Sequence, residues 1–230
     1  MGKVLMSWSG GKDCTLALHH FIKNSGKRPD GALTVYNTKF NRVTMHGVPI
    51  DLIKAQSEAL EMPLFTLGLP EDVTDKLYEE LLLNKFEELR RKGFDEVVFG
   101  DIFLEDLRAY RIRQLEKVGL KYQFPIWKRA TSALIGEFVS LGFKTMIVSI
   151  NGTVLPKDFA GMIINDSFIK ALPGKVDPCG ENGEFHTFVY DGPIFKNEIS
   201  FKKGKTIERK YVSPVDGNAV SYWFTDLIRK

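Results

Sequence analysis

The sequence predicts an α/β protein with a doubly wound, mostly parallel sheet, followed by a smaller α+β region. Two observations support this fold class. Apolar runs of strand type alternate with segments of helical apolar spacing through residues 1–150, which is the pattern of βαβ units. After Asn151 this alternation ends, and the sequence continues with a glycine-rich loop and several apolar runs of strand type that lie close together. We therefore expect a first domain over residues 1–150 and a second over residues 151–230.

The elements of the first region follow one another in a regular order. Strands are predicted where apolar residues run together, and helices where apolar residues recur every three to four positions. Pro49 suits the first position of a helix, and Leu77, Leu81 and Phe86 are expected to face the core from the longest helix. The predicted helices cover 15–21, 48–62, 73–94, 104–119 and 131–142, and the extended segments cover 4–8, 32–40, 63–69, 95–102, 121–127 and 143–150.

The second region is predicted to hold one short helix and several strands. The helix lies near 165–172 and a strand follows at 185–190. A β-hairpin is expected to turn at Lys203-Gly204, because glycine suits a tight turn. A last strand is predicted at 219–227.

Composition places the chain among ordinary globular proteins, with 43% hydrophobic residues. The net charge of +3 is too small to predict a nucleic-acid partner. No apolar stretch approaches the roughly 18 to 20 residues of a membrane span. Cys14 and Cys179 are the two cysteines, so no disulfide framework is expected. These features predict a soluble cytoplasmic protein without a membrane partner, and they leave a homo-oligomer open.

The stretch Ser9-Gly10-Gly11-Lys12-Asp13 lies between a predicted strand and a predicted helix. Glycines let the backbone approach an anion, and N–H groups at a helix N-terminus point toward it. The stretch fits neither the Walker A pattern nor the dinucleotide fingerprint GxGxxG. One alternative is a plain tight turn in which Asp13 caps the helix. The flanking strand and helix, with Lys12 inside the turn, favour a phosphate site.

A second group of polar residues crowds into seven positions near the carboxy terminus. Glycine-punctuated loops of this kind hold a cation or a polar substrate. His186 is a candidate general base, and Glu184, two residues earlier, is expected to share a strand face with it and to orient it. The alternative is a solvated turn before a strand; Cys179 and His186 alone do not supply a zinc ligand set. The candidate acceptor-binding and catalytic residues are Glu181, Asn182, Gly183, Glu184, His186 and Thr187.

Several other residues are weaker candidates. Gly100 and Asp101 end a strand on the side where open α/β sheets bind ligands, so both are candidate nucleotide contacts. Asp101 is also a candidate Mg²⁺ contact, with a helix cap as the alternative. His46 is a candidate site-lining residue or a surface-loop histidine. His19 and His20 lie inside the first helix and are not expected to be ligands.

Basic residues gather on one helix and on the late hairpin. Arg108, Arg111 and Arg113 are expected to lie on a solvated helix face, with phosphate contact as the alternative. The late hairpin is interpreted as a sheet edge protected by lysine, with docking of a protein or RNA partner as the alternative. Its basic residues are Lys202, Lys203, Lys205, Arg209 and Lys210.

The first motif resembles the PP-loop, SGGxDS, of the N-type ATP pyrophosphatases in the adenine-nucleotide alpha-hydrolase superfamily. The match fails at Cys14, where the pattern has serine. The resemblance implies ATP and Mg²⁺, with cleavage between the α and β phosphates. It implies that Ser9, Gly10 and Gly11 cradle the pyrophosphate, that Lys12 neutralises charge, and that Asp13 contacts Mg²⁺ or caps the helix.

Cys14 therefore allows three interpretations. A thiol donates a weaker hydrogen bond than a hydroxyl, so either the backbone N–H suffices at this position or ATP binding is weakened. Because a helix N-terminus lowers thiol pKa values, a nucleophilic Cys14 is the third reading.

Both motifs together look like the diphthine–ammonia ligase family, and the stretches 45–64, 99–102 and 124–127 add to the likeness. Family members use ATP and ammonia to amidate diphthine, a modified histidine of translation elongation factor two. The resemblance implies an AMP-forming ligase: an acceptor carboxylate is adenylated, then ammonia displaces AMP. The implied partners are ATP, ammonia and a carboxylate acceptor.

Asn182 and His186 stand where the diphthamide enzymes favour a glycine and an acid. The variant ENGEFHT resembles a bacterial branch connected with cobalamin salvage. The same ATP chemistry on a small-molecule acceptor is therefore an alternative. A regulatory protein that binds ATP without turnover is an alternative from another class, and RNA modification is a third.

Overall fold

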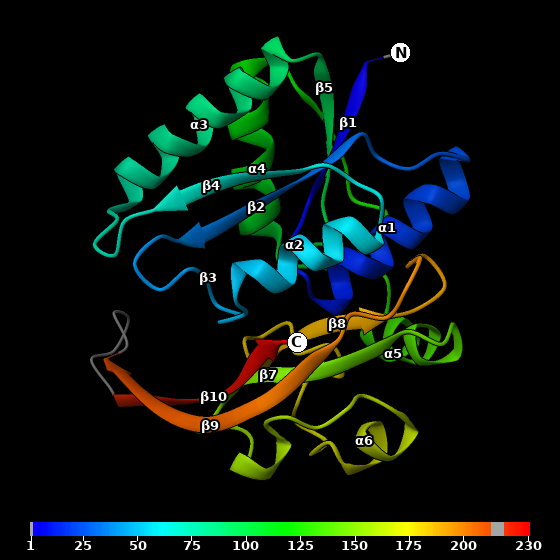
Figure 1. The fold of residues 1–230 in the computed structure, drawn as a ribbon, viewed down its shortest axis with the longest axis vertical. Coiled ribbons are helices and arrows are strands. Elements are labelled where there is room, and N and C mark those ends of the chain that lie inside the picture. The colour runs from blue at the N-terminus through cyan, green and yellow to red at the C-terminus, as the bar shows by residue number, and fades with distance from the viewer. Residues whose placement is uncertain (1, 213–218) are drawn as a thin grey trace.

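The computed structural model describes residues 2–212 and 219–230. Figure 1 shows two sheets, one above the other, with helices between them and on their outer faces. The upper sheet is mostly parallel and the lower one is antiparallel. The predicted fold class is confirmed.

The upper sheet orders its parallel strands β4-β2-β1-β5-β6, and β3 adds a short antiparallel pairing to β2. Leu5 of β1 pairs with Gly31 of β2 on one side and with Val97 of β5 on the other. From β1 the chain first adds strands on the β2 side of the sheet and later adds strands on the β5 side. The carboxyl end of β1 is therefore a topological switch point. The strands are β1 (Lys3–Ser7), β2 (Gly31–Asn37), β3 (Arg42–Val43), β4 (Leu64–Leu69), β5 (Phe94–Val98) and β6 (Lys121–Gln123).

Helices α1 (Lys12–Ser25) and α2 (Ile50–Ala59) lie between the two sheets, whereas α3 (Asp75–Arg91) and α4 (Glu105–Val118) cover the other face of the upper sheet. On α3, Phe86 is buried as expected, but Leu77 and Leu81 are only half-buried. Leu82 and Leu89 are the other buried side chains of this helix. The apolar stripe is therefore rotated relative to the prediction, because several leucines in a row leave its centre ambiguous.

The lower sheet has the order β8-β7-β10-β9. The expectation that residues 143–150 form a fifth strand of the parallel sheet is wrong, because this segment pairs antiparallel with β8 and β10. Six consecutive residues of β7 are buried, and such a run is typical of a central strand in either kind of sheet. The strands are β7 (Lys144–Asn151), β8 (Phe185–Asp191), β9 (Phe201–Val212) and β10 (Ala219–Arg229).

The expected hairpin turn at Lys203-Gly204 is also wrong, because β9 runs through both residues. The register of β9 against β10 shifts between Thr225 and Leu227. A Cβ on Gly204 would lie 3.1 Å from Cβ of Asp226 at this shift. The glycine therefore marks an irregular pairing inside a strand. The connection from β9 to β10 lies outside the described residues.

The remaining elements complete the lower half. They are α5 (Thr131–Ser140), the three-ten helix η1 (Lys157–Phe159) and α6 (Asp166–Ala171). One buried cluster includes Leu18 of α1, Ile53 of α2 and Phe188 of β8, so the two sheets share a core around the two central helices. Within the described residues, no helix combines the length and the apolar character needed to cross a bilayer.

Candidate active site

The loop of residues 9–13 joins β1 to α1 at the switch point of the upper sheet. Gly10 has a φ of +82°, a left-handed conformation that favours glycine. Gly11 is the N-cap of α1 and has no side chain to accept the first N–H groups of the helix. The helix N-terminus therefore offers backbone donors and a positive partial charge, which together make an anion site.

Lys12 adds a full positive charge to this loop. Its side chain is buried, and Nζ donates to both carboxylate oxygens of Asp13, at 2.9 and 2.7 Å. Nζ also lies 5.3 Å from the centre of the Phe185 ring. Burial disfavours the ammonium, but the Asp13 carboxylate together with the nearby Glu181 and Cys179 outweighs this effect and raises the pKa of Lys12 above its ordinary value. The charge on Lys12 is therefore permanent at physiological pH.

Cys14 fits the loop as a neutral thiol. Its Sγ donates to the carbonyl oxygen of Gly11 at 3.1 Å and lies 3.4 Å from the Ser9 hydroxyl. Burial raises the pKa of Cys14, so the thiolate needed for nucleophilic attack is disfavoured. These observations favour a tolerated substitution over a nucleophile.

Thr187 of β8 brings the second sequence motif to the PP-loop. Its hydroxyl accepts the Lys12 N–H at 3.0 Å, across 175 positions of sequence. Its carbonyl oxygen lies 2.9 Å from Nδ1 of His46. The ring of His46 lies 4.7 Å from the ring of His186. The two motifs and His46 therefore form one site.

The two imidazoles are neutral at physiological pH. Burial lowers the pKa of His46, and burial with the neighbouring His46 and Lys12 lowers the pKa of His186 well below its ordinary value. A Cβ on Gly11 would lie 2.6 Å from Cε1 of His46, so this ring packs directly on the loop. Each imidazole can accept a proton beside the phosphate site.

Glu184 organises its own loop instead of orienting His186. Its buried carboxylate accepts the backbone N–H of Asp177 at 3.0 Å, the backbone N–H of Asn182 at 2.9 Å and the Asn182 side-chain amide at 3.1 Å. Gly183, with a φ of +79°, makes the turn that closes this arrangement. The expected Glu184–His186 contact is not formed among the described residues, because β8 and its alternation begin one residue after Glu184.

Glu181, in the same segment, lies close enough to Asp13 and Lys12 of the phosphate loop to feel their charges. Burial raises the pKa of Glu181 to about 8; the nearby Asp13 and Asp101 carboxylates add to this effect, and Lys12 opposes it. Carboxylate oxygens suit Mg²⁺, and a cation would relieve their mutual repulsion. Among the described residues, however, no group of three or more histidine, cysteine or acidic side chains has the arrangement of a metal site. Asp13 and Asp101 as Mg²⁺ contacts stay a prediction.

Asp101 follows β5 and is held by α4. Its carboxylate pairs with Nε of Arg111 at 2.7 Å, and the Arg111 guanidinium lies 4.7 Å from the centre of the Phe99 ring. The expected solvated position of Arg111 is therefore wrong, whereas Arg113 is exposed as expected. Burial raises the pKa of Asp101, and Arg111 opposes this effect.

Gly100 lies against the first turn of α1. A Cβ at this position would stand 2.7 Å from the backbone nitrogen of Cys14 and 2.8 Å from its Cα. Backbone atoms cannot rotate aside as a side chain can. The close approach of β5 to the PP-loop therefore requires glycine at residue 100.

We expect Gly100→Ala to lower the free energy of unfolding by about 1–3 kcal/mol, the usual cost of overpacking. The added methyl group pushes α1 away from the end of β5. Urea unfolding followed by circular dichroism measures the change. Gly136→Ala in α5 is the matched control, since nothing lies within 4 Å of its Cβ position; this control should be neutral or slightly stabilising. Parent-like stability of Gly100→Ala would contradict the described packing.

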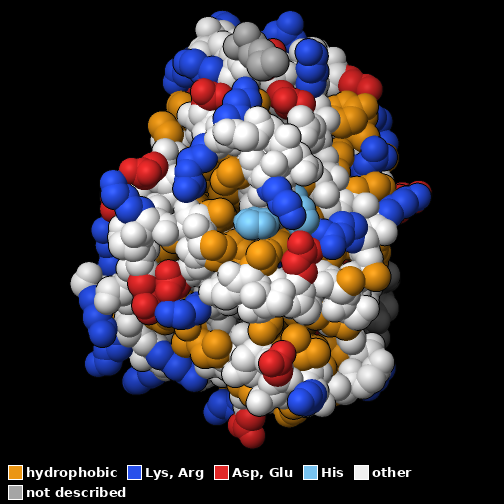
Figure 2. All heavy atoms as spheres, turned by 90° about the vertical axis from the view of Figure 1, so that its right-hand side faces the viewer, with side chains coloured by type: hydrophobic (Ala, Val, Ile, Leu, Met, Phe, Trp, Pro, Cys, Tyr) orange, Lys and Arg blue, Asp and Glu red, His pale blue; other side chains and the backbone are white. Residues whose placement is uncertain are grey.

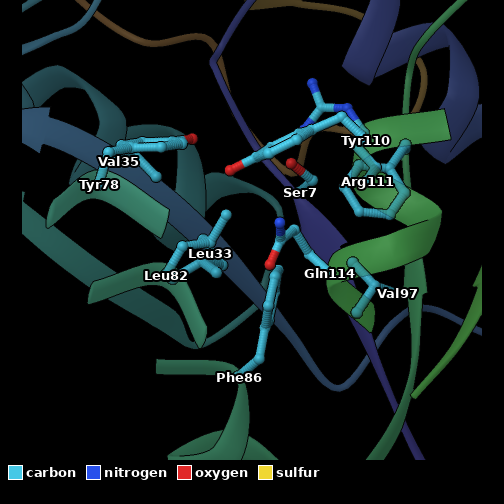
Figure 3. Close-up of a pocket in the computed structure, with 11 residues that line it drawn as sticks. Ser7, Leu33, Val35, Tyr78, Leu82, Phe86, Val97, Tyr110, Arg111 and Gln114 are labelled. Atoms are coloured by element: carbon cyan, nitrogen blue, oxygen red, sulfur yellow. The ribbon is translucent and has the colours of Figure 1, made fainter. Parts of the chain in front are cut away.

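A cavity of about 40 Å³ lies on the other face of the upper sheet, between the sheet, α3 and α4. Figure 3 shows Leu33 and Val35 on one side and Arg111 and Gln114 of α4 on the other. This volume has room for about one water molecule. The cavity is therefore too small to be the nucleotide site.

His19 and His20 lie within α1, beyond its first turn. His20 pairs with Glu137 of α5 at 3.1 Å, and Arg129 contacts the same carboxylate at 2.7 Å. Figure 2 looks onto the side of α1 and α5, and shows histidine with basic, acidic and hydrophobic side chains close by. This cluster joins α1 to α5.

Sequence reasoning missed Gln56, which ties the site together from α2. Its Nε2 donates to the carbonyl oxygens of Gly10 at 2.9 Å and Val189 at 2.6 Å, and its Oε1 accepts the Trp8 indole N–H at 2.9 Å. Gln56 is fully buried. A glutamine three residues after the buried Ile53 on an apolar helical stripe was the available signal.

This fold and this site define a PP-loop protein of the adenine-nucleotide alpha-hydrolase type. The loop follows the first strand of a doubly wound sheet and begins a helix. A second, carboxylate-bearing loop from another sheet meets it.

The comparison with known families gives a more particular assignment. The diphthamide synthase N-terminal domain matches residues 2–122, and the diphthamide synthase C-terminal domain matches residues 130–217. The chain therefore belongs to the diphthamide synthase family, and the predicted family resemblance is confirmed.

Curated relatives carry the name diphthine–ammonia ligase. The chain is 27% identical over 227 residues to the protein of Danio rerio, covering 86% of each chain. It is 25% identical over 222 residues to the human protein, covering 83% of this chain and 79% of the human one. The Schizosaccharomyces pombe relative is 23% identical over 90% of this chain, which spans 37% of that longer protein.

Proposed function

We propose that this protein is an ATP-dependent ligase that adenylates an acceptor carboxylate and then forms an amide with ammonia. The contact between the Lys12 N–H and the Thr187 hydroxyl is the observation that carries the proposal. It joins a phosphate-binding loop to the segment that bears Glu181 in a loop and His186 at the start of β8. A protein that only holds ATP has no need of these groups, and the name of the relatives supports the same class of reaction.

Two steps account for the reaction. An acceptor carboxylate oxygen attacks the α-phosphorus of ATP, the bond to the β-phosphate oxygen breaks, and pyrophosphate leaves. Ammonia then adds to the acyl carbon, and AMP leaves with the electron pair of the broken acyl–oxygen bond. Backbone N–H groups of α1 and the Lys12 ammonium stabilise the charge that develops on pyrophosphate. Mg²⁺ would neutralise phosphate charge, with Asp13 and Asp101 as the residues to hold it.

The neutral imidazole of His186 is the proposed proton acceptor for the attacking nitrogen. It lies beside His46 and close to Lys12, and it is free of the Glu184 carboxylate. His186 and Asn182 also distinguish this chain from the acid and glycine of the diphthamide pattern. We therefore propose that diphthine, as in the relatives, and a small-molecule carboxylate of the cobalamin-salvage branch are the two acceptors to compare.

Product analysis tests the proposal. The protein is incubated with Mg²⁺, ATP, ammonium and a panel of carboxylate acceptors, and adenine nucleotides are separated by chromatography. We expect equal amounts of AMP and pyrophosphate, formed only with an acceptor present. His186→Asn should keep its ATP affinity and lose amide formation by about a hundredfold. Formation of ADP instead of AMP would rule out the adenylation step.

A further inference from the structure

Strand β9 forms one edge of the lower sheet. It pairs with β10 along one side, and within the described residues no strand lies along its other side. Residues 207–211 are exposed on both faces of this strand, and Figure 1 shows β9 and β10 curving together below β3. An edge strand of this kind presents backbone N–H and C=O groups to another extended chain.

One face of β9 alternates basic and apolar side chains. Because residues two apart share a face, Lys205, Ile207, Arg209 and Tyr211 lie on the same side, and all four are exposed. Ile207 and Tyr211 expose 43% and 49% of their surface. We name these four residues the basic–apolar strip. Each of its apolar side chains has a cation as a neighbour.

Strand β10 extends the strip with aromatic residues. Phe224 pairs with Ile207, and Tyr222 pairs with Arg209. The Tyr222 ring lies 6.0 Å from the Tyr211 ring at 72°, and 6.4 Å from the Phe224 ring. The strip is therefore one edge of a wider apolar surface.

This surface reaches the rim of the candidate active site. A Cβ on Gly47 would lie 3.0 Å from Cδ1 of Phe224, and Gly47 directly follows the site residue His46. Met45, on the other side of His46, exposes 67% of its surface. A polypeptide bound along the strip would therefore pass beside the site entrance.

The net positive charge of β9 favours an acidic partner. The strand carries five basic residues and one acidic residue, a net charge of +4, against +3 for the whole chain. Two copies of β9 side by side would bring like charges together, which disfavours pairing between copies. An acidic strand placed along this edge would instead meet opposite charges at alternate positions.

We propose that the basic–apolar strip and the free edge of β9 bind an extended acidic segment of a partner protein, with acidic and apolar residues in alternation. The backbone edge supplies strand pairing, and the strip supplies specificity. Single-stranded RNA fits less well, because Tyr211 packs edge-on against Tyr222 and Ile207 offers no flat ring for a base. The proposal goes beyond the ligase reaction and does not depend on it.

Fluorescence anisotropy with a labelled peptide of roughly eight residues, alternating glutamate and valine, tests this binding; that length pairs along most of β9. We expect saturable binding to the parent protein. The double variant Lys205→Glu with Arg209→Glu should bind about tenfold more weakly. Lys121→Glu is the matched control, an exposed lysine of β6 at the edge of the other sheet, and it should bind like the parent.

Three results would overturn the proposal. They are absence of saturable binding to the parent, equal affinity of the double variant and the parent, and preferential binding of oligouridylate over the acidic peptide. A control peptide with lysine in place of glutamate should not bind. All measurements are made without ATP, so failure here leaves the ligase proposal untouched.

Discussion

Replacing Lys12 by methionine is expected to weaken ATP binding by about a hundredfold, since a charged hydrogen bond contributes about 1.5–3 kcal/mol. Methionine fills a similar volume but removes the buried positive charge. The Asp13 carboxylate, which Lys12 neutralises through two contacts, would then repel the triphosphate. Isothermal titration calorimetry with Mg²⁺ and ATP measures the change in affinity.

Lys23→Met is the control for this experiment. Lys23 lies in the last turn of the same helix and is exposed, so its loss removes the same charge without touching the loop. We expect its ATP affinity to equal that of the parent. Parent-like affinity of a folded Lys12→Met variant would contradict the phosphate site.

Replacing Gln56 by leucine is expected to lower the free energy of unfolding by about 3 kcal/mol, because each buried polar group left without a partner costs about 1–3 kcal/mol. The variant removes the acceptor of the buried Trp8 indole N–H and the amide that donates to the carbonyl oxygens of Gly10 and Val189. The Gly10 oxygen keeps the Val189 backbone N–H, at 2.9 Å. Gly10 belongs to the PP-loop, so ATP affinity should fall as well. Urea unfolding and calorimetry measure the two effects.

Gln123→Leu provides the matched control for Gln56→Leu. Gln123 is exposed, and its side-chain amide donates to the half-buried Glu96 carboxylate at 2.9 Å. The same chemical change should therefore alter stability by about 0.5 kcal/mol or less. If both variants unfold at the same urea concentration, Gln56 does not hold the loop to β8.

Local patterns account for the elements that the sequence predicts well. Each strand and helix up to α4 buries one face or both, and the spacing of its apolar residues shows which. This spacing is read from neighbouring residues, so no knowledge of the tertiary contacts is needed. The sequence predicts β7 in the wrong sheet, because its run of buried residues is typical of a central strand in either kind of sheet. The predicted turn at Gly204 is wrong because a glycine inside a strand and a glycine in a hairpin turn produce the same local sequence pattern.

Patterns along the chain are enough to predict the fold class, the PP-loop at the end of the first strand and the family resemblance. These features depend on residues that are neighbours in the chain, such as the glycines and Lys12 at a helix start. The contacts that these residues make are visible only in the folded protein. Thr187 caps the PP-loop across 175 positions, Arg111 holds Asp101, and Glu184 serves its own loop. Contacts of this kind depend on how two sheets pack around shared helices, which no short sequence pattern encodes.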